Sequence, residues 1–250
     1  MELILLFLIG LCIGSFGNLL ADRLPRGEDV LVSRSHCDSC KKNLSWYELI
    51  PLFSFLIQQR RCRKCHALLS WKYPLIELCM GLGFVGVGMI VGFGHLPTLL
   101  VGLLLFSMSV VIIVSDLNYF LIPDVTLVVM GLVGLYVLTT LPYQEVKTHL
   151  LSALAAFLGF YFLYIGTKEK GMGFGDVKLA GVLGLLLGFP NLVICLYTAF
   201  LTGAIVGVIL MIGGKAKMKT KVPFGPFLLF GAFVSTVWGA SLWRGWLHLL

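Results

Sequence analysis

Two aspartates stand beside long apolar runs, where an ionisable side chain is costly and therefore indicates a function. Asp116 directly follows the apolar run over 97–115, and Asp176 follows a stretch with three glycines in five residues. Two carboxyls at one membrane depth can share a proton, because like charges at about 3 Å cannot both ionise. One carboxyl then acts as acid and the other as base, as the attack of water on a peptide carbonyl requires. Asp116 and Asp176 are therefore the candidate catalytic pair.

The acidic residues also have structural explanations of different strength. Asp124 follows Pro123, an ordinary helix start that favours a negative charge, so structural and catalytic roles are equally open for it. Asp176 could serve only as a helix N-cap. Asp116 lies at the C-terminal end of its run, where the helix dipole opposes a negative charge, and this indicates a function. Glu77 lies inside another apolar run, with a basic residue of the preceding segment as its expected partner.

A polar segment over 22–74 carries a second chemical pattern. It contains two Cys-x-x-Cys pairs, formed by Cys37, Cys40, Cys62 and Cys65. This spacing brings four thiolates within reach of one tetrahedral zinc ion, which would be structural because no coordination position stays open. His36 and His66 flank the pairs and are alternative ligands. Disulfides are the other interpretation, but the segment is expected in the cytoplasm, where thiols stay reduced.

Long apolar runs must position these groups. Hydrophobic residues make up 58% of the 250 residues and charged residues 12%, whereas a soluble domain carries roughly 25% charged residues. Runs of about 20 apolar residues suit helices that cross a bilayer. We expect such helices over 3–21, 75–92, 97–115, 122–140, 148–166, 177–189, 191–213 and 224–249. The sequence thus predicts an all-α, polytopic membrane bundle of about eight transmembrane helices with a small zinc-ribbon-like loop domain.

The basic residues predict the orientation of this bundle. When the eight runs alternate across a bilayer, all Lys and Arg residues except Lys147 and Arg244 fall on one side. The positive-inside rule assigns that side to the cytoplasm. Asp116, Asp124 and Asp176 then lie at the cytoplasmic boundary. The net charge of +7 is explained by these loops and does not indicate a nucleic-acid partner.

Six sequence blocks occur in an order that resembles a known family. They are Gly14-Ser-Phe-Gly-Asn18 with Arg23-Leu-Pro25, the paired Cys-x-x-Cys segment with Ile50-Pro51-Leu-Phe-Ser54 inside it, Ser70-Trp-Lys-Tyr-Pro74, Asp116 with Ile122-Pro123-Asp124, Gly173-Phe-Gly-Asp176-Val-Lys178, and Pro223-Phe-Gly-Pro226. Together they resemble the type IV prepilin peptidases, the bifunctional leader peptidase and N-methyltransferase family of GxGD membrane aspartic peptidases.

The resemblance implies an activity, a location and cofactors. Asp116 and Asp176 would be the catalytic aspartates of a multi-pass enzyme of the bacterial plasma membrane. It would remove the short basic leader from type IV prepilins or pseudopilins at the cytoplasmic face, in pilus assembly, protein secretion or competence. The resemblance also implies N-methylation of the new N-terminus from S-adenosylmethionine, for which the sequence shows no cofactor-binding residues.

The resulting division of the chain has three parts. Residues 1–21 form the first transmembrane helix, residues 22–74 the cytoplasmic loop domain, and residues 75–250 a seven-helix membrane peptidase domain. Two other functions remain alternatives. A proton-coupled or cation transporter would use the intramembrane aspartates differently and should show paired repeats or broken helices at the midplane. A zinc-dependent membrane methyltransferase without peptidase activity would leave Asp116 unexplained.

Overall fold

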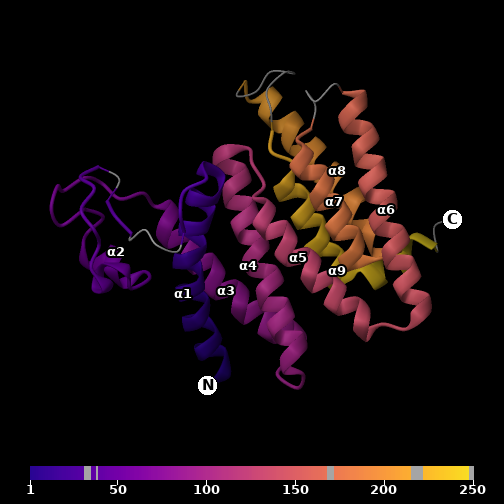
Figure 1. The fold of residues 1–250 in the computed structure, drawn as a ribbon, viewed down its shortest axis with the longest axis horizontal. Helices are drawn as coiled ribbons and strands as arrows, with labels where there is room; N and C mark the ends of the chain where they lie inside the picture. The colour runs from indigo at the N-terminus through magenta and orange to yellow at the C-terminus, as the bar shows by residue number, and fades with distance from the viewer. Residues whose placement is uncertain (31–34, 38, 168–171, 215–221, 248–250) are drawn as a thin grey trace. The chain divides into compact units, whose positions relative to one another are not determined.

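The computed structural model describes residues 1–30, 35–37, 39–167, 172–214 and 222–247 (Figure 1). Within these residues the regular structure is helical, and no strand longer than an isolated bridge occurs. This confirms the predicted all-α class. The chain divides into two compact units, Met1–Val114 and Ser115–Leu250.

Close packing of two long helices organises the first unit. Helix α1 (Glu2–Arg23) packs along α3 (Lys72–Val91). A Cβ atom at Gly10 or Gly14 would lie 2.8 Å from an α3 backbone atom, so only glycine permits this approach. In a membrane, where lipid is as apolar as the side chains, such close packing is itself a source of helix association.

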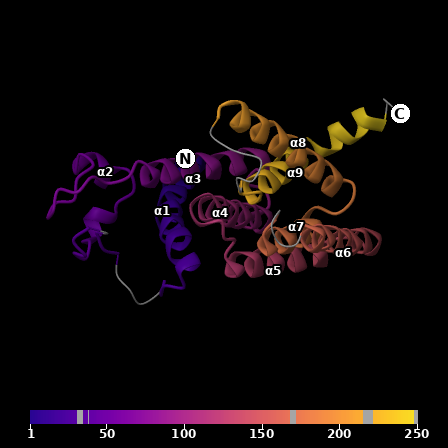
Figure 2. The same ribbon diagram turned by 90° about the horizontal axis from the view of Figure 1, so that it is seen from above.

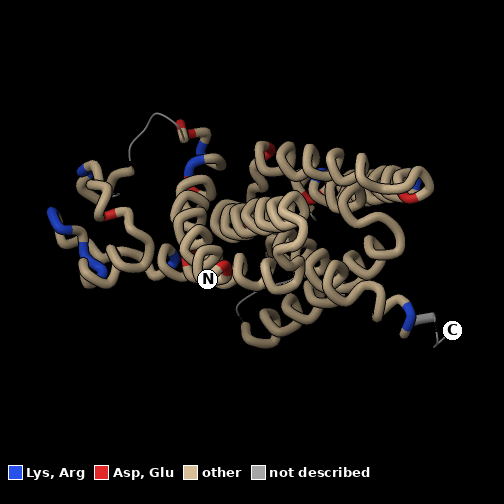
Figure 3. Tube along the Cα trace, turned by 90° about the horizontal axis from the view of Figure 1, so that it is seen from below, with Lys and Arg blue, Asp and Glu red and all other residues tan. Residues whose placement is uncertain are grey.

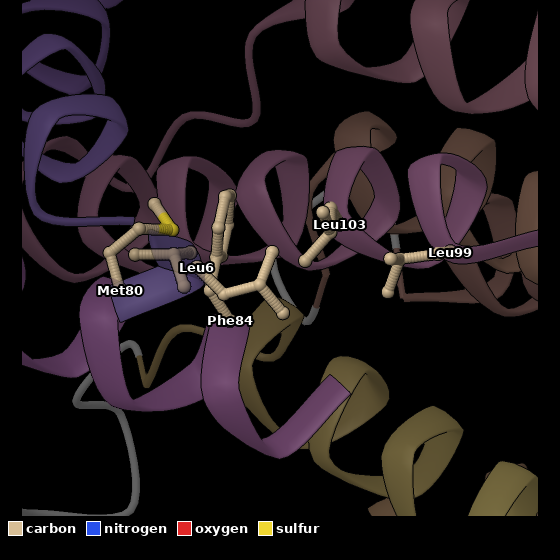
Figure 4. Packing of buried hydrophobic residues seen from close by; sticks show 6 residues of the cluster. Leu6, Met80, Phe84, Leu99 and Leu103 are labelled. Atoms are coloured by element: carbon tan, nitrogen blue, oxygen red, sulfur yellow. The ribbon is translucent and has the colours of Figure 1, made fainter. Parts of the chain in front are cut away.

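An apolar cluster joins α1 and α3 to α4 (Leu96–Tyr119). Figure 4 shows its buried side chains, which are Leu6, Met80, Phe84, Leu99, Leu103 and Val110. Leu6 comes from α1, and the last three come from the part of α4 that belongs to this unit. The cluster fixes α1 and α3, the two helices that the polar loop connects, against α4.

The loop between α1 and α3 contains only short helices. These are η1 (Leu24–Arg26), η2 (Trp46–Leu49) and α2 (Phe53–Ile57). Figure 3 shows Lys and Arg gathered in this part of the first unit, whereas the long helices are almost free of charge along their length. The first unit therefore combines a membrane-type helical core with a basic, cysteine-containing loop.

A short central helix organises the second unit. After the end of α4 come α5 (Asp124–Thr140), α6 (Tyr143–Gly166), α7 (Phe174–Leu187), α8 (Asn191–Ile212) and α9 (Gly225–Leu247). Helix α7 lies between α5 and α6 and also packs against α8 and α9 (Figures 1 and 2). A Cβ atom at Gly184 of α7 would lie 2.7 Å from the Ala153 Cα of α6. The helix that carries Asp176 is thus held from several sides.

The eight predicted apolar runs all coincide with helices, but the predicted number of eight membrane crossings is not confirmed. Among the described residues, six helices are long and apolar enough to cross a bilayer, namely α1, α3, α4, α6, α8 and α9. Helix α5 has 17 residues and α7 has 14. A helix of the length of α7 spans about 21 Å, against about 30 Å of hydrocarbon. The six long helices fit a multi-pass membrane protein.

Candidate active site and cysteine cluster

Asp116 lies in the last turn of α4, because that helix continues beyond the predicted end at residue 115. The Asp116 carbonyl accepts a hydrogen bond from the Phe120 N–H at 2.9 Å, and Phe120 has a left-handed φ of 55°. This conformation ends the helix. The Ser115 hydroxyl then donates to the Leu121 carbonyl at 2.6 Å and fixes the turn that leads to α5. The Asp116 side chain is buried.

The start of α9 compensates the unfavourable position of Asp116. The backbone N–H of Gly225 donates to Asp116 Oδ2 at 3.0 Å. Gly225 is the first residue of α9, and N–H groups there have no partner within their own helix. The positive end of one helix dipole thus faces a carboxylate that its own helix disfavours. Sequence reasoning missed this contact, although Pro223-Phe-Gly-Pro226 marks a helix start.

Asp176 occupies the third position of α7 and is not its N-cap. Gly173 is the N-cap residue, and its N–H donates to Asp176 Oδ2 at 3.2 Å. The other carboxyl oxygen, Oδ1, is buried and has no hydrogen-bond partner among the described residues. One oxygen of Asp176 therefore supports the helix start, whereas the other is free for a proton, a water molecule or a substrate.

The structure brings the two aspartates into one buried site of the second unit. Asp116 and Asp176 are close enough to interact electrostatically. Ile122 links their surroundings: its side chain lies 3.1 Å from a Cβ placed on Gly175 and 3.4 Å from one placed on Gly225. The glycines on α7 and α9 therefore leave room for the turn after α4. Two neighbouring buried carboxyls with a free oxygen can hold and transfer a proton.

The four cysteines of the loop form one cluster in the first unit. Their sulfur atoms all lie within 4.8 Å of one another, with Cys37 Sγ 3.8 Å from Cys65 Sγ and Cys40 Sγ 4.0 Å from Cys62 Sγ. Tetrahedral zinc with Zn–S bonds of about 2.3 Å places its sulfur ligands about 3.8 Å apart. The four cysteines are free thiols. The cluster is thus compatible with structural zinc, and neither His36 nor His66 belongs to it.

Matching backbone turns present the thiols. The Lys41 N–H donates to the Cys37 carbonyl, and the His66 N–H donates to the Cys62 carbonyl, both at 2.9 Å. Each donor lies four residues after the first cysteine of its pair. Both donor residues adopt a left-handed φ. The N–H groups of Cys65 and Lys64 lower the pKa of the Cys62 thiol to about 6. Cys65 shifts the other way: although the Ala67 N–H lowers it, desolvation and the three neighbouring thiols raise the pKa of the Cys65 thiol to about 11, so the first thiolate of the cluster forms on Cys62.

Comparison with known proteins agrees with this arrangement. The model of the bacterial peptidase A24 N-terminal domain matches residues 8–91, and the model of the type IV leader peptidase family matches residues 103–208. The first range contains the four cysteines and the second both aspartates.

Several relatives match over nearly the whole chain. A prepilin leader peptidase/N-methyltransferase of Aeromonas salmonicida strain A449 is 33% identical over 98% of this chain and 94% of its own length. The protein of the same name from Bacillus subtilis strain 168 is 30% identical over 95% of both chains. This chain belongs to the type IV leader peptidase family. No solved structure matches it.

In this family member, Asp124 lies outside the buried pair. It is the first residue of α5, and its side chain is 69% exposed. Lys178 Nζ donates to Asp124 Oδ1 at 2.6 Å and lies 5.2 Å from the centre of the Phe174 ring. Asp124 thus ties the start of α5 to the first turns of α7. This contact favours the structural interpretation of Asp124.

Glu77 of the family's N-terminal domain has polar partners that sequence reasoning did not find. The N–H of Leu52 donates to Glu77 Oε2 at 2.9 Å, and the Ser15 side chain also hydrogen-bonds the carboxyl. Leu52 has a left-handed φ of 59°, which a leucine rarely adopts. The carboxylate therefore stabilises an uncommon turn of the loop.

The contact between Gly225 and Asp116 gives a test of the site geometry. A Cβ at position 225 would lie 2.7 Å from Asp116 Oδ2, so a Gly225→Ala change forces the carboxylate away from its N–H donor. Because misplacement of a reacting group by about 1 Å can cost 10²-fold, we expect prepilin cleavage to fall by about 10- to 100-fold. Gly159→Ala is the control, since a Cβ at this glycine of α6 would meet no atom within 4 Å. Equal activity of the two variants, at equal expression, would contradict the geometry.

Proposed function

We propose that this chain is a membrane aspartic endopeptidase that removes the short basic leader of type IV prepilins or pseudopilins and N-methylates the new N-terminus. The observation that carries this proposal is the buried pair Asp116 and Asp176 in a chain that belongs to the type IV leader peptidase family. The relatives' name, prepilin leader peptidase/N-methyltransferase, supplies the substrate class and the second activity. The transporter alternative is not supported, because the family is one of peptidases.

The proposed mechanism uses one proton shared by the two carboxyls. The ionised carboxylate takes a proton from water, and the resulting hydroxide oxygen forms a bond to the scissile carbonyl carbon. The protonated carboxyl donates its proton to the carbonyl oxygen, which neutralises the charge that develops there. Collapse of the tetrahedral intermediate breaks the C–N bond: the leaving amine takes a proton from one carboxyl, and a hydroxyl of the intermediate returns a proton to the other, which restores the single shared proton. The free Asp176 Oδ1 is a suitable acceptor for the first transfer.

The four cysteines would hold zinc in a structural role. With Cys37, Cys40, Cys62 and Cys65 as ligands, the ion would cross-link the two halves of the loop and leave no position for substrate. In the proposed division, residues 22–74 form this cytoplasmic loop domain, and residues 75–250 carry the peptidase site.

S-adenosylmethionine is the methyl donor that the second activity implies. The described residues contain no sheet, so a nucleotide site of the Rossmann type, at the ends of parallel strands, does not fit them. We therefore assign no residue to this cofactor and derive no step through it.

We place the cleavage at the cytoplasmic face of the plasma membrane. The proposal rests on the distribution of Lys and Arg: if all eight apolar runs cross the bilayer, all of these residues but Lys147 and Arg244 lie on the side of the aspartates. A basic leader that precedes an apolar helix would meet the membrane at the same level.

Mass spectrometry of a prepilin substrate tests both activities. We expect the purified enzyme in lipid vesicles to remove the leader, and to add one methyl group to the new N-terminus only when S-adenosylmethionine is present. Intact substrate after incubation with folded enzyme would refute the peptidase assignment. Cleavage without methylation would refute only the second activity.

Asp124→Asn should separate the structural aspartate from the catalytic pair. The exposed Asp124–Lys178 ion pair is worth about 1 kcal/mol or less, so its loss should lower cleavage by less than about fivefold. Lys178→Met removes the same ion pair from the other side and should give a similar value. If Asp124→Asn lost all cleavage while Asp116→Asn retained it, Asp124 and not Asp116 would belong to the catalytic pair.

A further inference from the structure

Helix α2 of the loop exposes an apolar face. The side chains of Phe53, Leu56 and Ile57 are spaced i, i+3 and i+4, so they share one side of the helix. These residues are 60%, 68% and 68% exposed. Phe55 points to the opposite side, where it is buried and lies 5.0 Å from the Trp71 ring. The helix therefore packs with one side and presents large apolar groups with the other.

The Glu77 contact fixes the depth of α2 relative to the membrane. Leu52 is the N-cap residue of α2, and its N–H donates a hydrogen bond to Glu77 Oε2. Glu77 is the sixth residue of α3, a helix long and apolar enough to cross the bilayer. It therefore lies about 7 Å along α3 from the first residue. The contact therefore holds the start of α2 beside the first turns of α3, the part of a spanning helix that passes from water into hydrocarbon.

The surroundings of α2 have the composition of a membrane interface. Trp46 and Trp71 of the loop are 77% and 60% exposed. Arg60 lies 5.2 Å from the centre of the Trp71 ring, and Arg63 lies 5.0 Å from the centre of the Tyr47 ring. Exposed aromatic rings next to cations are typical of segments at the level of lipid headgroups.

We infer that α2 is an interfacial helix, whose Phe53–Leu56–Ile57 face lies in the bilayer at the boundary between headgroups and acyl chains. Glu77 sets its depth, and the helix thereby anchors the cysteine loop to the membrane surface between its two Cys-x-x-Cys pairs. Lipid fits this face better than a protein does, because the exposed apolar side chains stand beside arginines and exposed tryptophans, the composition of segments that lie among lipid headgroups. The inference does not depend on the carboxylate pair.

Depth-dependent quenching tests this placement in the full-length protein. An environment-sensitive fluorescent amino acid is introduced at position 56, and separately at Asn43, an exposed polar residue of the same loop. Each protein is reconstituted in vesicles that contain brominated phospholipid. We expect the probe at position 56 to lose fluorescence, more strongly with bromine near the headgroup than with bromine at the end of the acyl chain. The probe at position 43 should lose none.

Variants of Glu77 test the role of the anchor. Glu77→Leu removes the acceptor for the Leu52 N–H and should reduce the quenching at position 56, whereas Glu77→Gln keeps a carbonyl acceptor and should retain it. Zinc content of each variant serves as the check that the loop is folded. Absence of quenching at position 56 in a zinc-loaded protein would overturn the proposal, as would equal quenching at both positions. A second copy or a substrate on this face would shield position 56 from bromine and so give the same refuting result.

Discussion

Replacing Asp116 or Asp176 by asparagine is expected to abolish prepilin cleavage while leaving folded protein in the membrane. Asparagine is nearly isosteric, and its carbonyl oxygen can still accept the N–H of Gly225 or Gly173. It cannot exchange a proton at neutral pH. Because the loss of a catalytic acid or base commonly costs 10²- to 10⁴-fold, we expect a decrease of about 10³-fold or more.

The double variant distinguishes a catalytic pair from two independent residues. Groups that act as a unit show strongly non-additive losses, so the double asparagine variant should be no worse than either single variant. Asp124→Asn is the matched control, since it makes the same chemical change on an exposed aspartate in the same turn region. Substantial cleavage by Asp116→Asn or Asp176→Asn, at the expression level of wild type, would end the proposal of a catalytic pair.

Removal of the cysteine ligands should have a large effect on the loop and a smaller one on catalysis. The wild-type protein should contain about one zinc ion per chain, as four thiolates in one cluster require. Cys37→Ser together with Cys62→Ser should remove the metal and expose residues 22–74 to limited proteolysis, because binding of a structural metal is coupled to folding. Some cleavage of prepilin should survive, since the aspartates lie in the other unit.

A matched control for this experiment lies within the same unit. Cys79→Ser changes an exposed cysteine of α3 that is not part of the cluster, and it should leave metal content and protease resistance unchanged. If the wild-type loop resisted protease equally well after complete removal of metal by a chelator, the zinc assignment would be wrong.

The helical architecture could be predicted from hydropathy alone, because every long apolar run forms a helix. The ends of the helices could not. Helix α4 continues through Asp116 to Tyr119, since leaving the apolar region does not by itself break backbone hydrogen bonds. Helix α7 stops at Leu187, before Gly188 with its left-handed φ of 62°. The helix therefore begins three residues before the predicted run over 177–189 and ends two residues before the end of that run.

The partners of the acidic residues were equally inaccessible to sequence reasoning. Asp116 accepts a backbone N–H from a residue 109 positions away, and Glu77 accepts one from a residue 25 positions away. Backbone donors leave no charge in the sequence that could be paired with a carboxylate.

The shortness of α7 bears on how this enzyme obtains its second reactant. Hydrolysis consumes water, and the hydrocarbon of a bilayer excludes it. Helix α7 falls short of the hydrocarbon thickness by about 9 Å, so either the bilayer thins beside it or one end lies below the membrane surface. Asp176 is only two residues from the start of α7. Thinning of the bilayer beside α7 would bring bulk water closer to this carboxyl.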